Sequence, residues 1–216
     1  MNTVIFDMDG VIIDSEPIHF DVDIKTMDYF GFSISSKELE KYVGMTNPEM
    51  WSLIKDEYSL IQSIDEIINY QLENKIRIIR ELDISPIQGI TELLFQLKKH
   101  SVPVGIASSS PRRFIEEVLK KFDLLGYFSC IVSGEEVPRG KPAPDVYIEA
   151  ANQLGVKAEA CIVIEDSTNG VLAAKNAGMR CIGYRNINSG NQNLSHADIV
   201  VDSIKEINLR DILQIR

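Results

Sequence analysis

The order in which short apolar runs and amphipathic stretches alternate limits the fold of this chain more than any other feature. Short runs rich in Val, Ile and Cys, bounded by Gly, Pro, Ser or Asp, are typical of buried strands. They occupy residues 3–6, 102–107, 127–132, 161–164, 181–184 and 199–201. Helical periodicity fills residues 89–100, 111–124, 144–154 and 169–177. This alternation predicts an α/β protein with a Rossmann-like, mostly parallel sheet that is covered on both faces.

One block interrupts the alternation. Residues 15–85 carry no convincing strand pattern, and helical patterns occupy residues 18–29, 36–42, 48–58 and 64–82. We therefore predict a Rossmann-like catalytic core domain of residues 1–14 and 86–216, and an inserted all-helical cap domain of residues 15–85. Because ligands of open α/β sheets bind at the carboxyl ends of the strands, this insertion is expected to lie over the site as a lid.

Composition and charge limit the class of partner. The chain has 216 residues, of which 44% are hydrophobic, and its formal net charge is -10. An acidic surface disfavours nucleic acid and anionic membranes, whereas a small anionic substrate can be held by local cations at short range. The sequence shows neither a signal-peptide pattern nor an apolar run of membrane-spanning length. We expect a cytoplasmic monomer, with Cys130, Cys161 and Cys181 as buried thiols in a reducing compartment.

The first acidic pair, Asp7 and Asp9, follows the first strand, and Gly10 allows the backbone to turn away tightly. Residues two apart at a strand end project to the same side. Their mutual repulsion is relieved when a hard divalent cation lies between them or when one of them keeps its proton. An ordinary surface turn is the alternative, but the position after a buried strand favours a metal site.

Glu165 and Asp166 form a second acidic pair at the end of another predicted strand. Taken alone, the segment could cap the next helix through Asp166 or Ser167. Because it falls at the same edge of the sheet as Asp7, we favour a metal site shared by the two pairs.

Two further segments have the chemistry of an anion site. A glycine and two prolines surround Lys141 in a stiff loop, so its ammonium is a candidate clamp for a phosphoryl oxygen, unless it is simply a surface lysine. Ser108, Ser109 and Ser110 run from a strand end into a helix start. Their hydroxyls and free N–H groups form either an anion site or an ordinary N-cap.

Taken in order, these segments resemble the haloacid dehalogenase superfamily of phosphotransferases. The matching motifs are Asp-x-Asp-Gly-Val at 7–11, a serine at 108, Gly-Lys-Pro-x-Pro at 140–144 and Glu-Asp-Ser at 165–167. Together they cover the chain from Val4 to about Ala177. The run of residues 7–17 with its helical insertion looks like the branch that contains β-phosphoglucomutases and sugar-phosphate phosphatases.

The resemblance implies roles for the acidic residues. Asp7 would be the nucleophile that forms an aspartyl phosphate, and Asp9 the general acid and base. Mg²⁺ would be held by the Asp7 carboxylate, the Asp9 backbone carbonyl and Asp166, with Glu165 near or in its coordination shell.

The phosphoryl group would be bound by Ser108 and Lys141, with Ser109 beside them. These roles predict a magnesium-dependent phosphatase that acts on a small phosphorylated metabolite, a sugar phosphate first of all. A dehalogenase proper is disfavoured, because it needs neither the Asp9 acid nor a metal. A non-catalytic binding or regulatory protein is disfavoured because the nucleophile and the acid are both present.

The inserted block should choose the substrate. In β-phosphoglucomutases a loop resembling Lys-Gly-Val-Ser-Arg grips the second phosphate of a sugar bisphosphate, whereas Val43 and Asn47 flank Gly44 here without a charge. Hydrolysis is therefore favoured, and a β-phosphoglucomutase-type mutase is the alternative. Candidate substrate contacts are His19, Gly44, Asn47, Ser110 and Arg112. For His19 a half-buried helix residue, and for Arg112 a solvated one, remain open alternatives.

Overall fold

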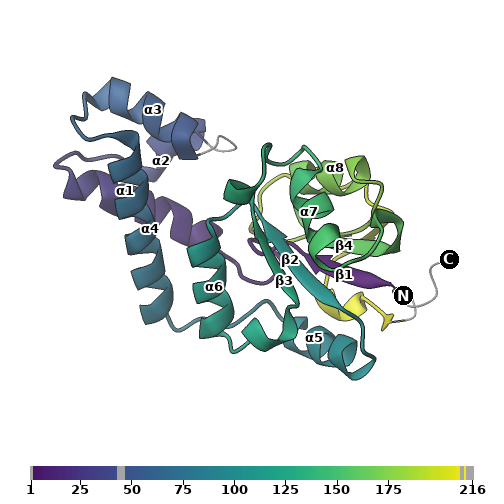
Figure 1. The fold of residues 1–216 in the computed structure, drawn as a ribbon. Helices are drawn as coiled ribbons and strands as arrows, with labels where there is room; N and C mark the ends of the chain where they lie inside the picture. Colours follow the sequence, from purple (N-terminus) through teal and green to yellow (C-terminus); the bar gives the residue numbers. More distant parts are fainter. Residues whose placement is uncertain (1, 43–46, 210–211, 213–216) are drawn as a thin grey trace. The chain divides into compact units, whose positions relative to one another are not determined.

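The computed structural model describes residues 2–42, 47–209 and 212. The chain divides into two compact units (Figure 1). The first, the sheet unit, consists of Met1–Asp14 and Asp83–Arg216, and the second, the helical unit, of Ser15–Leu82. Each unit is described by itself below.

The described part of the sheet unit contains a six-stranded sheet in which every pairing is parallel. Its strands are β1 (Thr3–Phe6), β2 (Val104–Ser108), β3 (Cys130–Ser133), β4 (Cys161–Glu165), β5 (Arg180–Tyr184) and β6 (Ile199–Val201). The strand order is β3-β2-β1-β4-β5-β6, so β1 lies between β2 and β4. This arrangement confirms the predicted α/β fold with a parallel, Rossmann-like sheet.

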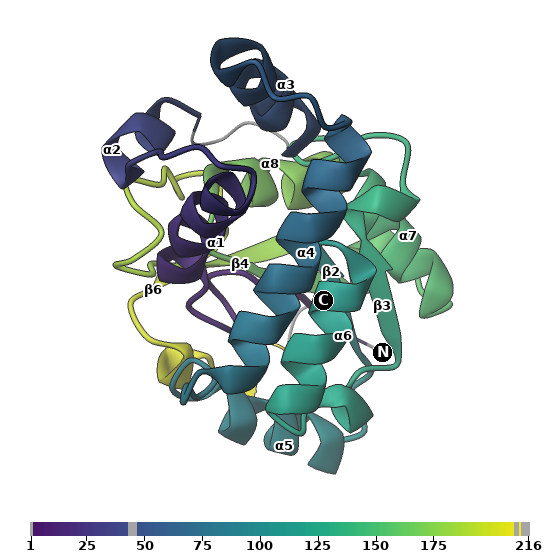
Figure 2. The same cartoon turned by 90° about the vertical axis from the view of Figure 1, so that its left-hand side faces the viewer.

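Helices cover both faces of this sheet. They are α5 (Ile90–Lys99), α6 (Arg112–Lys121), α7 (Asp145–Gln153) and α8 (Thr168–Asn176), with short 3₁₀ turns η2 (Leu125–Tyr127), η3 (Gly134–Glu136), η4 (Ala158–Ala160) and η5 (Ile204–Glu206). Right-handed crossovers put α5 and α6 on one face and, after the chain crosses back to β4, α7 and α8 on the other. Figure 1 shows α6 on one side of the strands and α7 and α8 opposite, and Figure 2 has α6 in front.

Because both faces are covered, the strands are apolar through most of their length. Ile5, Val132 and Val163 pack with Tyr147 and Val171 in one buried cluster under α7 and α8. Polar side chains therefore gather where the strands end, which is where a site can form.

The helical unit has its own core. It contains α1 (Glu16–Tyr29), α2 (Ser36–Leu39), η1 (Glu40–Tyr42), α3 (Asn47–Tyr58) and α4 (Ile64–Glu81). Trp51 and Ile54 of α3 are fully buried and pack with Met27 and Ile67 in one apolar cluster. The start of α4 is fixed by a capping box, in which Ser63 and Glu66 satisfy each other's backbone N–H groups.

The predicted elements are present, with shifted ends. The strand predicted at 127–132 begins at Cys130, because Leu125–Tyr127 forms a 3₁₀ turn before it. The three cysteines are free and buried, as predicted. Within the part of the chain that the structure describes, no helix is long and apolar enough to cross a membrane.

Candidate active site

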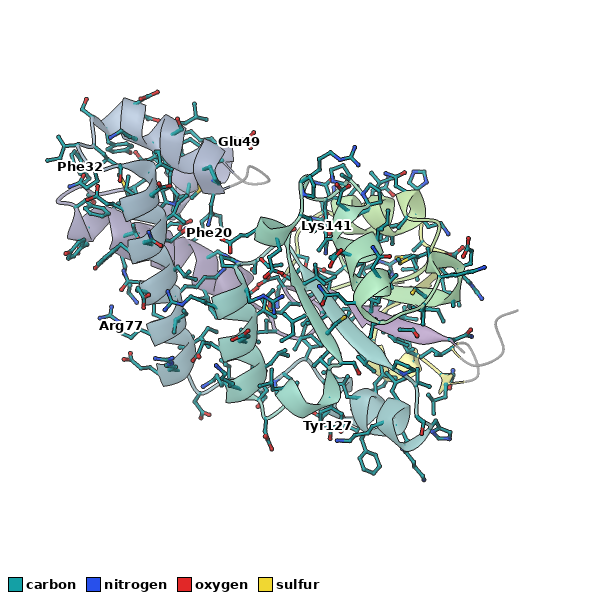
Figure 3. All side chains as sticks on the ribbon, in the orientation of Figure 1. Phe20, Phe32, Glu49, Arg77, Tyr127 and Lys141 are labelled. Carbon is teal, nitrogen blue, oxygen red and sulfur yellow. The ribbon has the colours of Figure 1, made fainter. Side chains whose placement is uncertain are left out.

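Three neighbouring strands bring the predicted site residues together. Asp7 directly follows β1, Ser108 ends β2 and Glu165 ends β4. Because parallel strands end at the same edge of a sheet, these residues share one edge. Lys141 lies at this end of the sheet unit in Figure 3, far from Tyr127, which precedes β3.

An acidic cluster of Asp7, Glu165 and Asp166 occupies this edge. One carboxylate oxygen from each residue lies within 4.8 Å of the others. All three residues are buried, with exposed fractions of 6%, 0% and 4%. Lys141 Nζ donates to Asp7 Oδ1 at 2.5 Å and to Glu165 Oε1 at 2.8 Å. The cluster is therefore held together by a buried ammonium group.

The electrostatics of the acidic cluster favour the addition of a cation. Burial and the neighbouring carboxylates raise the pKa of Asp7 well above its usual value, although Lys141 opposes the shift. Burial, with Glu165 second, raises the pKa of Asp166 to about 7. Burial alone would lower the pKa of Lys141, but the charges of Asp7 and Glu165 raise it, so Lys141 stays cationic. Among the described residues of this cluster, three carboxylates face one ammonium group, and their hard oxygen donors fit Mg²⁺.

The Glu165 carboxylate accepts four hydrogen bonds. Its Oε1 accepts from Lys141 and, at 3.0 Å, from the Tyr147 hydroxyl. Its Oε2 accepts from the backbone N–H and the hydroxyl of Ser167 at 2.8 and 2.9 Å. A Cβ on Gly170 would lie 1.5 Å from Oε1, so only glycine leaves room there. Four hydrogen bonds suit Glu165 to anchor Lys141 better than to bind a metal directly.

Asp9 has a different environment from Asp7. Its Oδ2 accepts from the Ser110 hydroxyl at 2.6 Å and from the Ser108 hydroxyl at 3.3 Å. The Asp9 carboxylate is thus held by the end of β2 rather than by Lys141. Gly10, at φ +79°, turns the chain away as expected, and a Cβ there would lie 1.9 Å from Asp166 Oδ2.

The other phosphate-site candidates differ in their setting. Ser109 is exposed next to the buried Ser108 and Ser110. The Arg112 guanidinium donates to Glu136 and, at 2.6 Å, to the Ile131 carbonyl. Arg112 therefore ties α6 to the segment around β3, and these contacts do not bring it to the acidic cluster.

The remaining candidates belong to the helical unit. Asn47 Nδ2 donates to Gln71 Oε1 at 2.9 Å, and Gln71 in turn donates to the buried Asp23. Burial raises the pKa of Asp23, with the Gln71 hydrogen bond and the charge of His19 opposing the shift. Gly44 lies outside the described residues.

Sequence reasoning missed several residues around the acidic cluster. Tyr147 lies within the predicted helix of residues 144–154 and was not singled out, yet its hydroxyl donates to Glu165. Ser189 donates to Asp166 Oδ2, and Asn186 Nδ2 donates to the Gly10 carbonyl at 3.0 Å. A polar run directly after a buried strand, at the carboxyl edge of a parallel sheet, was the signal available for these two residues.

Comparisons with known proteins agree with this architecture. A family described as haloacid dehalogenase-like hydrolase matches residues 4–184. Hexitol phosphatase B of Escherichia coli is 33% identical over 97% of this chain and 95% of its own length. A phosphorylated carbohydrates phosphatase of Thermotoga maritima is 32% identical over 84% of each chain. The crystal structure of a β-phosphoglucomutase from Clostridium difficile superposes with a TM-score of 0.81 at 26% identity, over 99% of this chain and 96% of that one.

Proposed function

The chain belongs to the haloacid dehalogenase-like hydrolases and is a phosphatase of that family, and on this basis we propose a specific reaction for it. The proposed reaction is the magnesium-dependent hydrolysis of a small phosphorylated metabolite, a sugar or polyol phosphate, through an aspartyl phosphate on Asp7. The family membership supplies the reaction class, and the acidic cluster supports the assignment of roles to residues.

The observation that carries this proposal is the contrast between Asp7 and Asp9. Asp7 lies against Lys141, with Glu165 and Asp166 beside it, in a setting suited to a nucleophile whose charge is compensated. Asp9 lies two residues away beside the hydroxyls of Ser108 and Ser110. Because a hydroxyl can both donate and accept a hydrogen bond, these groups can orient the Asp9 carboxyl in its ionised and in its protonated form, as a general acid and base requires. Two carboxylates in unlike environments can divide the two tasks.

The carboxylates of Asp7 and Asp166 and the Asp9 backbone carbonyl would hold the metal ion. Glu165, already engaged in four hydrogen bonds, would keep Lys141 in place. When bound, Mg²⁺ supplies positive charge that lets one anion approach another.

In the first half of the reaction, an ionised Asp7 oxygen attacks phosphorus and forms the aspartyl phosphate. The bond from phosphorus to the ester oxygen breaks, and Asp9 delivers a proton to that oxygen. Lys141 and the Ser108 hydroxyl bind the phosphoryl oxygens, on which charge accumulates during the transfer.

In the second half, Asp9, now ionised, takes a proton from water as the water oxygen attacks phosphorus. The bond between phosphorus and Asp7 breaks and inorganic phosphate leaves. The Asp7 carboxylate and the protonated Asp9 are then restored for the next cycle.

The choice of a sugar or polyol phosphate rests on the relatives, which include a hexitol phosphatase and a phosphorylated carbohydrates phosphatase. We propose that the helical unit acts as a cap domain and selects the substrate, with His19, Gly44 and Asn47 as its candidate contacts.

The test is phosphate release from a panel of hexose, pentose and hexitol phosphates, with and without Mg²⁺. The wild-type enzyme should release phosphate only with the metal, and Asp7→Asn should reduce release to the buffer level. Asp202→Asn, which changes an exposed carboxylate on the same unit, is the matched control and should behave as wild type. Equal activity of the Asp7 variant and the wild type would refute the proposal.

A phosphomutase remains the second candidate, favoured by the structural likeness to a β-phosphoglucomutase. A catalytic amount of a sugar 1,6-bisphosphate separates the two reactions. A mutase would isomerise a hexose 1-phosphate under this priming, whereas a phosphatase releases inorganic phosphate without it.

A further inference from the structure

Residues 185–192, the segment that follows β5, make three side-chain contacts at the carboxyl edge of the sheet. One is with the turn at Gly10 and two are with carboxylates. Asn186 Nδ2 donates to the Gly10 carbonyl at 3.0 Å, and the Asn186 side chain is buried. Ser189 Oγ donates to Asp166 Oδ2, and Asn188 Nδ2 donates to Asp14. From these contacts we infer that Asn186 and Ser189 are positioning residues that orient Asp166 and the turn at Gly10 for metal binding.

This segment is held rigid by its own hydrogen bonds. The Asn188 N–H donates to Asn186 Oδ1 at 2.9 Å, which fixes the Asn186 amide. Gln192 Nε2 donates to the Ser189 carbonyl at 2.9 Å, and Gln192 Oε1 accepts from the Thr168 N–H at 2.9 Å. The hydroxyl of Ser189 is therefore presented from a backbone that is tied to the start of α8.

The turn at Gly10 and the segment after β5 both contact the carboxylate of Asp166. A Cβ on Gly10 would lie 1.9 Å from Asp166 Oδ2 and 2.8 Å from the Ser189 hydroxyl oxygen, so the three groups are in close contact. The Ser189 hydroxyl therefore fixes the orientation of the Asp166 carboxylate, one of whose oxygens belongs to the acidic cluster. When a residue that orients a metal ligand by a hydrogen bond is removed, the metal affinity typically falls about 10- to 100-fold.

The inference rests on the metal site of the proposed function, and it adds residues that act through Asp166 rather than on the substrate. It predicts a defect in metal affinity, not in chemistry. For Ser189→Ala we expect Mg²⁺ affinity, measured by isothermal titration calorimetry, to fall about 10- to 100-fold. Ser189→Thr keeps a hydroxyl and should restore most of the affinity.

Two further measurements distinguish positioning from a general structural role. The thermal unfolding of Ser189→Ala in EDTA should stay close to that of the wild type. Its phosphate release should need more Mg²⁺ for half-maximal rate and should approach the wild-type kcat at saturating Mg²⁺. Ser195→Ala, which removes an exposed hydroxyl further along the same segment, is the matched control and should change none of these quantities.

Asn186→Ala provides an independent test through the other contact, and it should also weaken Mg²⁺ binding. Wild-type affinity in both Ser189→Ala and Asn186→Ala would overturn the inference while leaving the proposed function intact. A wild-type protein that binds no Mg²⁺ in the calorimeter would instead refute the proposed metal dependence, so the two failures are distinguishable.

Discussion

Removal of the negative charge of Asp166 should stabilise the metal-free protein at neutral and alkaline pH. Burial and the neighbouring Glu165 raise the pKa of Asp166 from its ordinary 3.8 to about 7 in the folded state. Between these two values the folded chain binds more protons than the unfolded chain. The stability of the metal-free protein must therefore fall as the pH rises through this window, and Asp7, whose pKa is also raised, acts in the same direction.

The size of the effect follows from the shift of Asp166. A tenfold change in proton affinity corresponds to about 1.4 kcal/mol, so ionising the buried Asp166 costs about 4 kcal/mol in total. Of this, roughly 2 to 3 kcal/mol is lost between pH 5 and pH 8. In a chain of 216 residues, this loss corresponds to a decrease in Tm of about 5 to 10 °C.

The assay is differential scanning calorimetry in EDTA at several pH values from 5 to 8. Asp166→Asn keeps the shape of the side chain and an oxygen for the Ser189 hydroxyl, but it cannot ionise. The variant should show a weaker dependence on pH and a higher Tm than the wild type at pH 8. Adding Mg²⁺ should stabilise the wild type, by about 2.7 kcal/mol at 100 times its Kd, and leave the variant nearly unchanged.

The comparison between the two proteins at each pH isolates this carboxylate from all the other ionisable groups, because the two proteins share them. A wild-type protein that is more stable in EDTA at pH 8 than at pH 5 would contradict the reasoning. So would a lower Tm of Asp166→Asn at pH 8, because the ionised carboxylate would then stabilise the fold despite its burial.

Other substitutions test other parts of the molecule. Lys141→Met should lower kcat about 10²- to 10³-fold in phosphate-release assays, because the charge on the transferring group loses its clamp. Ser110→Ala should lower kcat about 10-fold or more in the same assay, since the hydrogen bond that orients the Asp9 carboxylate is lost. Gln71→Leu should lower the free energy of unfolding by about 1 to 3 kcal/mol in urea titrations, because the buried Asp23 loses a donor; an unchanged midpoint would contradict this.

The alternation of strands and helices was predictable because each element repeats a local pattern. A strand buried on both faces is a short apolar run, and its end is marked by the first polar residue, as Asp7 directly follows β1 and Glu165 ends β4. Because parallel strands end at one edge, the spatial convergence of these acids followed from the fold class alone. Prediction succeeded where one pattern determined both the element and its end.

The residues that support these acids could not be predicted in the same way. Asn186 donates a hydrogen bond to the Gly10 carbonyl, although the two residues are 176 positions apart in the sequence. No sequence periodicity connects them. The hydroxyl of Tyr147 reaches Glu165 only because α7 packs on the sheet in this register. For Arg112, the sequence left open a solvated or a substrate-binding role, and its pairing with Glu136 depends on where η3 ends.

The acidic cluster has a further consequence for catalysis. The burial that raises the pKa of Asp7 also favours its protonated form, which has no anionic oxygen with which to attack phosphorus. Lys141 opposes this shift but does not cancel it, because burial is the largest cause and Glu165 and Asp166 add to it. Positive charge added beside this cluster lowers the pKa of Asp7 again, so metal binding should favour the ionised form that attacks phosphorus. The loss of stability of the metal-free protein with rising pH and the control of the nucleophile are then two results of the same burial.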